Sequence, residues 1–147
     1  MRINKPIAAT IIGALSTIPY EILTRALKLL GYAKYTVYEL SSLMITLNRP
    51  DKVLGSFMSM IIGASISIIL YCAIAIIGWF GWDHIILKSI FISLQSWLFL
   101  EGLFMWLIEG RNFIPLRPIS DYYSQFFCVF IYGIILGLLF QKYIRTK

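Results

Sequence analysis

Seven charged side chains are the candidates for chemistry in this chain, because they lie inside long apolar runs or directly beside them. They are Glu21, Arg25, Glu101, Glu109, Arg111, Arg117 and Asp121. Glu101 is the most informative, since it lies inside the apolar run 85–108, roughly 10 Å before the run ends. A carboxylate at that depth is costly unless it is protonated, paired or in contact with water. We therefore expect Glu101 to face other protein groups.

These residues are compatible with three functions. In the first, they form a network of salt bridges that carries out no reaction. The network fixes the registry of the helices in a small membrane subunit. In the second, the protein is an ion or solute channel or transporter, in which Glu101 binds and releases a proton or cation beside Glu21 and Arg25. In the third, Arg111 and Arg117 bind a phosphate headgroup.

In that third case, Asp121 or Glu109 would act as a base in an interfacial lipid-processing enzyme. Ion pairs within the chain can give each of these acidic side chains a partner, without further assumptions. We therefore take the non-enzymatic subunit with a polar centre around Glu101 as the main interpretation. Whether the protein is an enzyme stays open, and the two alternatives are kept.

Glu21 and Arg25 are one helical turn apart, in the favourable order for an ion pair within a helix. Pro19 should kink the helix just before them and free a backbone carbonyl. One interpretation is a surface ion pair where the helix leaves the membrane. The other is an internal pair that faces Glu101.

Metal, cofactor and nucleophilic chemistry have no pattern to support them. Cys72 and Cys128 each lie in the middle of an apolar run, where a thiol is usually a small apolar group. The single histidine, His84, lies about 25 Å from Glu101 along a straight helix. No glycine-rich phosphate loop is present. We expect no cofactor, no metal and no disulfide.

Composition places the chain in a membrane. Of its 147 residues, 59% are apolar and 14% are charged, and the mean hydropathy is +0.81. A soluble domain of this size could not bury that much apolar surface. The net charge of +6 comes from Lys and Arg that flank apolar runs, a pattern that suits lipid headgroups and not nucleic acid. We expect a single domain, 1–147, in the cell membrane.

The hydrophobic pattern predicts an all-α fold, a polytopic four-helix membrane bundle with one short additional helix. The predicted spans are about 6–30, 50–78, 84–108 and 121–143. Between the first two, Thr36 and Glu39 form a capping box before an amphipathic helix at about 35–48. That helix is too short to cross easily, so we expect it to lie in the interface or re-enter. A fifth, short crossing is the alternative topology.

Small residues at four-residue spacing predict close helix packing. The rows are Gly55, Ser59, Gly63 and Ser67, and Gly133 with Gly137. Such rows let two backbones approach in a membrane, where burial of apolar surface gives little drive. The partner can be another helix of the same chain or a second copy. Beyond the bilayer, we therefore expect a homo-oligomer or a larger membrane complex.

Local signals predict where several helices begin and end. Gly31 should stop the first helix, while Asp83 and Ser120 should act as N-caps of later ones. Trp79 and Trp82 should form an aromatic belt at the interface. In the third span, Ser89, Ser93 and Ser96 should face a different direction from the buried acid.

The C-terminal quarter contains a pattern from Arg117 through Asp121 to Gly133 and Gly137. It resembles the end of VanZ-type small membrane proteins, and the resemblance covers less than a quarter of the chain. Gln125 stands where that family has an asparagine, and the glycine spacing is displaced. We therefore do not assign the chain to that family.

Overall fold

The computed structural model describes residues 4–78 and 81–145, and within these ranges every regular element is a helix. In chain order the elements are α1 (Lys5–Leu15), α2 (Thr17–Leu29), α3 (Val37–Thr46), α4 (Lys52–Ala75), α5 (Ile85–Phe104), the π-helical turn η1 (Met105–Glu109), α6 (Ile119–Phe140) and the π-helical turn η2 (Gln141–Arg145). The all-α prediction is confirmed for the described residues.

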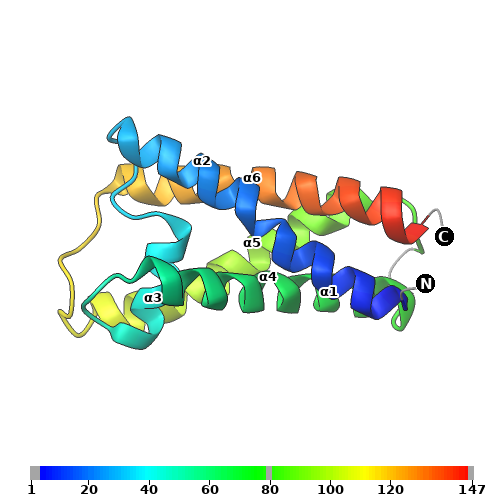
Figure 1. Cartoon of the computed structure of the whole chain (residues 1–147), viewed down its shortest axis with the longest axis horizontal. Coiled ribbons are helices and arrows are strands. Elements are labelled where there is room, and N and C mark those ends of the chain that lie inside the picture. The colour runs from blue at the N-terminus through cyan, green and yellow to red at the C-terminus, as the bar shows by residue number, and fades with distance from the viewer. Residues whose placement is uncertain (1–3, 79–80, 146–147) are drawn as a thin grey trace.

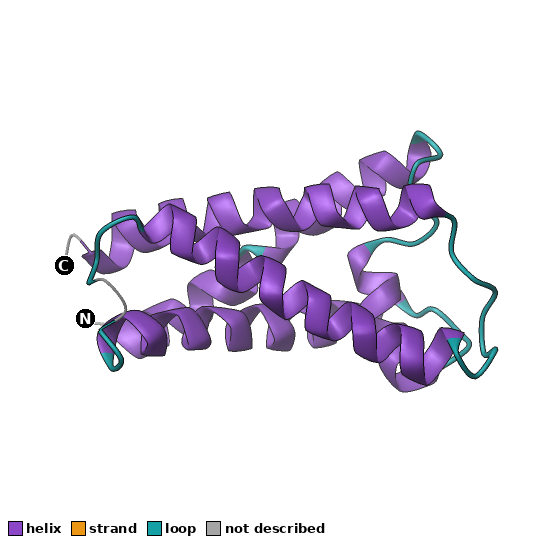
Figure 2. Ribbon diagram, turned by 180° about the vertical axis from the view of Figure 1, so that it is seen from behind, coloured by secondary structure: helices purple, strands orange, loops and turns teal. Residues whose placement is uncertain are grey.

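Four helical stretches are long and apolar enough to cross a membrane. They are Lys5–Leu29, Lys52–Ala75, Ile85–Glu109 and Ile119–Arg145. Large apolar side chains cover their outer surfaces; Leu87 and Phe99, for example, are each 68% exposed. Such a surface is compatible with lipid contact. The described ends of the chain lie together at one end of the bundle, while α3 lies at the other (Figures 1 and 2).

Two helix pairs form the body of the bundle. α1 packs along α4, and α5 packs along α6. A Cβ added at Gly13 would lie 2.3 Å from the carbonyl oxygen of Gly63, so α1 and α4 touch through their backbones. Gly133 and Gly137 meet the backbone of α5 at Ile90 and Ile86 in the same way, at 2.7 Å. The glycines of both predicted rows therefore contact other parts of the same chain.

The first span breaks at Ser16, which separates α1 from α2. Pro19 has no N–H to donate to the carbonyl of Leu15, so the helix cannot continue regularly through that turn. Figure 1 shows that α2 turns away from the direction of α1 and runs beside α6. The kink lies where the proline predicted it, and it brings Glu21 toward α3.

α3 begins with the predicted capping box: Thr36 accepts from Glu39 N–H, and the Glu39 side chain accepts from Thr36 N–H. The polar side of this helix does not face outward. Ser41 and Ser42 are 6% and 0% exposed, and Ser42 Oγ accepts from the N–H of Asp51 at the start of α4. The amphipathic pattern therefore suggested a free polar face that the fold covers with α4.

The other helix ends match the ends predicted from the sequence only in part. Gly31 follows α2 with a φ of +85°, as the predicted stop requires. Asp83 is not an N-cap, because His84 occupies that position and the Asp83 side chain lies 3.6 Å from Arg145. Ser120 is not one either, since α6 begins a residue earlier, after Pro118. Trp79 lies outside the described residues.

Candidate functional site

Arg117 lies in the loop 110–118 between η1 and α6, and three carboxylates enclose its guanidinium. Nε donates to Glu109 Oε1 at 2.6 Å, and Nη1 donates to Asp121 Oδ2 at 3.0 Å. Nη2 donates to Glu101 Oε1 in a third, short contact. We call these four residues the Arg117 cluster. It gathers charged groups from α5, η1, the loop and α6 around one cation.

Two aromatic rings contact the guanidinium of Arg117. The Arg117 Cζ atom lies 4.6 Å from the ring centre of Phe104 and 4.5 Å from that of Tyr122. Tyr122 also donates its hydroxyl proton to Glu109 Oε2 at 2.7 Å. The Arg117 side chain is 0% exposed. A planar guanidinium suits this position, because it can stack on rings while it donates in its plane.

The π-helical turn η1 explains how Glu101 and Glu109 reach the same cation. In a regular α-helix, eight residues at about 100° each would place the two carboxylates about 80° apart around the axis. A π-helical turn takes more residues per turn and so rotates each residue less, which closes this angle. Its hydrogen bond runs from Gly110 N–H to the carbonyl of Met105, at 2.6 Å. Glu109 thereby turns toward Arg117.

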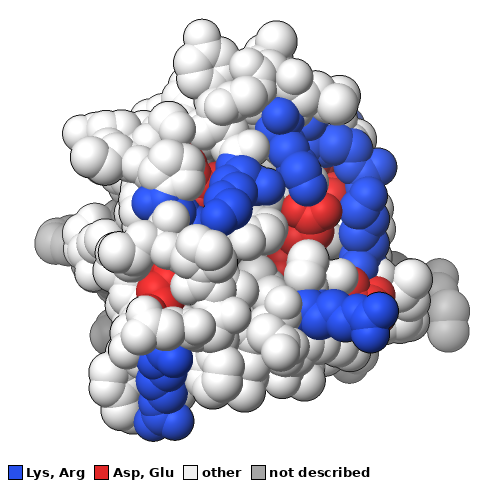
Figure 3. Space-filling model, turned by 90° about the vertical axis from the view of Figure 1, so that its left-hand side faces the viewer, with Lys and Arg blue, Asp and Glu red and all other residues white. Residues whose placement is uncertain are grey.

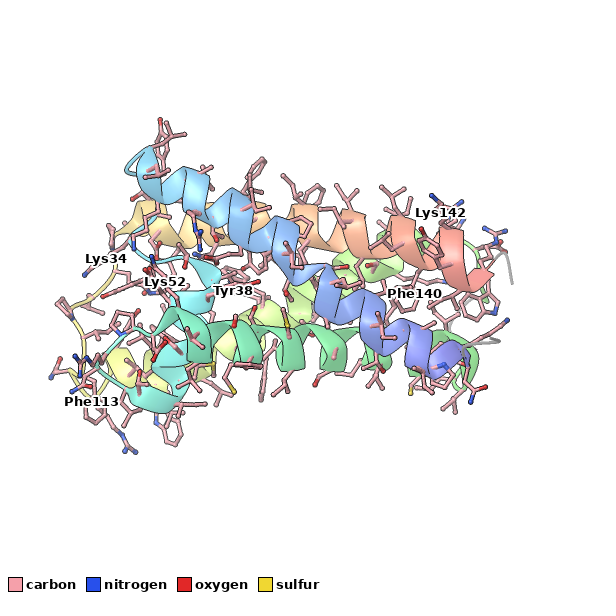
Figure 4. The ribbon with its side chains drawn as sticks, in the orientation of Figure 1. Lys34, Tyr38, Lys52, Phe113, Phe140 and Lys142 are labelled. Carbon is pink, nitrogen blue, oxygen red and sulfur yellow. The ribbon has the colours of Figure 1, made fainter. Side chains whose placement is uncertain are left out.

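Asp121 is held from two sides. It lies in the first turn of α6, where the helix dipole favours an acid. Its Oδ1 accepts the backbone N–H of Lys34 at 2.8 Å, and its Oδ2 accepts from Arg117. The α2–α3 connection is therefore fastened to the cluster by its backbone. Figure 4 places Lys34 and Phe113 at one end of the bundle and Lys142 at the other.

Glu21 and Arg25 form a second group of charges, which we name the α2–α3 clamp together with Thr24, Lys28 and Glu39. Glu21 Oε1 accepts from Arg25 at 3.0 Å, and its Oε2 accepts the N–H of Tyr38 at 3.1 Å. Thr24 Oγ1 accepts the N–H of Val37 at 3.2 Å. Lys28 Nζ donates to both oxygens of Glu39, at 2.8 and 2.7 Å.

The clamp satisfies N–H groups that the start of α3 would otherwise leave without acceptors. Its acids are buried, while the side chains of Arg25 and Lys28 are 54% and 38% exposed. Of the two interpretations of the Glu21–Arg25 pair, the one in which it faces Glu101 is not met, because Arg25 pairs with Glu21 and Arg117 pairs with Glu101. Figure 3 looks at this end of the molecule and shows acidic side chains recessed between basic ones.

Arg111 does not join either group. It is exposed, and its Cζ lies 5.6 Å from the ring centre of Trp106. The predicted pairing of Arg111 with Arg117 around a headgroup is not met, because the Arg117 side chain is sealed and its donors face carboxylates. Arg111 alone remains available at the surface.

A cavity of about 90 Å³ lies between α2, α3, α4, α5 and α6. Its polar lining groups are Thr17, Tyr20, Ser41, Ser59, Ser93, Glu101, Gln125 and Tyr132. Glu101 therefore belongs to both the Arg117 cluster and the cavity wall. Ser93 lines the same cavity as Glu101, while Ser89 donates to the carbonyl of Gly133 on α6.

Sequence reasoning missed Tyr20 and Gln125. The Tyr20 hydroxyl donates to Gln125 Oε1 at 3.1 Å, and Gln125 Nε2 donates to the carbonyl of Tyr35 at 3.2 Å. This chain of bonds joins α2, α6 and the start of the α3 segment beside the cavity. A single polar residue inside an apolar run was the available signal for Gln125. Tyr20 gave none, because tyrosine is common at every depth of such helices.

Within the described part of the chain, no three His, Cys, Asp or Glu side chains are grouped so that they could hold a metal ion. Glu101, Glu109 and Asp121 instead surround a guanidinium. Comparisons of this chain with protein-family models, curated proteins and solved structures find no match, so function is inferred from this geometry alone.

Proposed function

We propose that this chain is a small non-enzymatic protein of the cell membrane, whose Arg117 cluster holds its helices in register. The observation that carries the proposal is the complete enclosure of Arg117 by carboxylates from three segments. Breaking such a buried pair is strongly destabilising, since it leaves charges without a partner. The cluster therefore supports a role in specifying how α5, η1 and α6 meet the α2–α3 connection.

The geometry gives little support to the interpretation as a lipid-processing enzyme. A headgroup phosphate would need free donors on Arg117, and the base would need access to the substrate. Asp121 and Arg117 have fully buried side chains and bond to each other. Glu109 is 3% exposed and bonds to Arg117 and Tyr122. Of the two arginines in that interpretation, Arg111 is the one whose side chain is exposed.

Self-association is a further part of the proposal, as a homo-oligomer or as a subunit of a larger membrane complex. The fold restricts how it could occur. Gly55, Gly63, Gly133 and Gly137 are in close contact with other parts of the same chain. A second copy would therefore need a different surface from the one that the small-residue rows suggested.

Transport remains a second candidate, because one observation favours it: Glu101 lines the internal cavity. A buried carboxyl beside a space that can hold water is a common feature of ion pathways. Proton and cation flux into proteoliposomes separates the two functions. We expect wild-type protein to give no flux above that of protein-free vesicles. Flux that Glu101→Gln abolishes in a correctly folded protein would replace our proposal with transport.

A further inference from the structure

The internal cavity has a polar group that the protein leaves unsatisfied. Ser93 is 1% exposed, and its Oγ is the buried side-chain atom that finds no hydrogen-bond partner among the described residues. Burying a hydroxyl without a partner costs free energy. The space beside it, about 90 Å³, is well above the ~10–15 Å³ that one water needs. Within a mostly apolar lining, Ser93 therefore offers a polar group that a water or a ligand could satisfy.

The charge beside the cavity is unbalanced. In the Arg117 cluster, three carboxylates surround one guanidinium, which leaves an excess of two negative charges if all are ionised. Glu101 uses Oε1 for Arg117, and its Oε2 accepts no hydrogen bond from the described residues. Of the three acids, it is Glu101 that lines the cavity. A cation in the cavity would reduce this imbalance at Glu101.

The cavity borders a groove that opens on the outer surface of the bundle. This groove runs between α4 and α5, two neighbouring helices that pack more loosely than the pairs α1–α4 and α5–α6. Its lining is mostly apolar and includes Ile61, Ile69 and Phe99. Ile62, Ile66 and Leu100 line both the groove and the cavity. An apolar chain in the groove would therefore lie next to the cavity.

We propose that the cavity binds the head of a lipophilic amine, which enters from the bilayer between α4 and α5. The ammonium group faces Glu101, since it offers three donors and no acceptor. The alkyl chain lies along Ile62, Ile66 and Leu100 and continues into the groove. Water carried in with the ammonium group supplies the missing partner of Ser93. The charge beside the cavity supports a cationic head over a neutral or anionic one, and the apolar groove supports a ligand with an alkyl chain.

Trp97 provides a probe, because it lines the cavity. The protein is reconstituted in phosphatidylcholine nanodiscs with Trp97 as its sole tryptophan, the other three being changed to phenylalanine. A long-chain primary amine that carries bromine in the half of its chain nearer the nitrogen then serves as the quencher, because that half lies against the cavity that Trp97 lines. The alcohol and the carboxylate of the same chain length are the matched ligands. A second protein keeps Trp106 instead, which is 64% exposed and reports quencher that is merely dissolved in lipid.

The amine should quench Trp97 with saturation, at a concentration at least about tenfold lower than the alcohol requires. Trp106 should show only a linear decrease with either ligand. Glu101→Gln should remove the preference for the amine over the alcohol. Ser93→Leu fills the cavity without changing charge and should abolish saturable quenching, whereas Ser56→Leu, outside the cavity and groove, should leave it unchanged.

Three results would overturn the proposal. One is equal affinity of Trp97 protein for the amine, the alcohol and the carboxylate. Another is quenching of Trp97 and Trp106 to the same extent and without saturation. The third is a Ser93→Leu protein that is folded and binds the amine as tightly as the wild type. Because Ser93→Leu keeps every charge of the Arg117 cluster, this test remains decisive even if Glu101→Gln does not fold.

Discussion

The Arg117 cluster and the α2–α3 clamp lie at the same end of the bundle and use the same kinds of side chain. They differ in where the cation sits. In the clamp, Glu21 and Glu39 are buried, but Arg25 and Lys28 extend to the surface, 54% and 38% exposed. In the cluster, the Arg117 side chain is 0% exposed and three acids share it.

This difference decides what each group can tolerate. A cation at the surface keeps its hydration, so its removal exposes the acid to water and little energy is lost. A sealed cation has given up its hydration, and its removal leaves the buried acids Glu109 and Asp121 without their cation. The clamp therefore fastens α2 to the start of α3 with replaceable charges. We therefore expect the cluster to matter more for how α5, η1 and α6 are held together.

The most severe test of this contrast is Arg117→Met. We expect it to lower the free energy of unfolding by about 3–5 kcal/mol, because three carboxylates would lose their cation and two of them, Glu109 and Asp121, are buried. Thermal unfolding of the purified protein in mild detergent, followed by circular dichroism, measures the loss. A protein as stable as the wild type would show that the cluster does not hold the fold together.

A second substitution tests the reason for that loss. Adding Glu101→Gln to Arg117→Met removes one of the stranded charges and should restore part of the stability. Coupling between groups in one network is typically about 0.5–3 kcal/mol. If the double variant is less stable than Arg117→Met alone, charge repulsion is not the cause of the loss.

The architecture followed from the sequence to a large extent, because it rests on local patterns. The runs of apolar residues gave four long helices, and Thr36 with Glu39 gave the start of α3. Pro19 predicted the kink between α1 and α2, and Gly31 predicted the end of α2. Each of these signals acts over a few residues, so no knowledge of the tertiary structure was needed.

The candidate site could be predicted only in part. Depth alone indicated that Glu101 needs a partner, but not which one. A regular helix keeps Glu109 away from Glu101, and no residue type announces the π-helical turn that brings them together. Arg117 reaches the site from the loop 110–118, which connects η1 to α6. The acid was predictable, whereas its partner depends on tertiary structure.

Thr36→Ala should have a smaller effect, at the point where the clamp meets α3. Thr36 Oγ1 accepts the N–H of Glu39 at 3.4 Å, and loss of such a cap costs about 1 kcal/mol. Hydrogen exchange at Val37 and Tyr38 should also become faster. Thr36→Ser, which keeps the capping hydroxyl and removes only the methyl group, is the control. Equal losses in the two variants would show that capping by Thr36 is not important.

Arg25→Ala should have the smallest effect, although it also removes an arginine from a buried acid. Glu21 keeps the N–H of Tyr38 as a partner, and water can take the place of the half-exposed guanidinium. We expect a loss below about 1 kcal/mol that shrinks further as salt is added, since screening weakens a surface pair. Unfolding at low and high ionic strength measures both. A loss as large as that of Arg117→Met, and independent of salt, would mean that exposure of the cation does not distinguish the two groups.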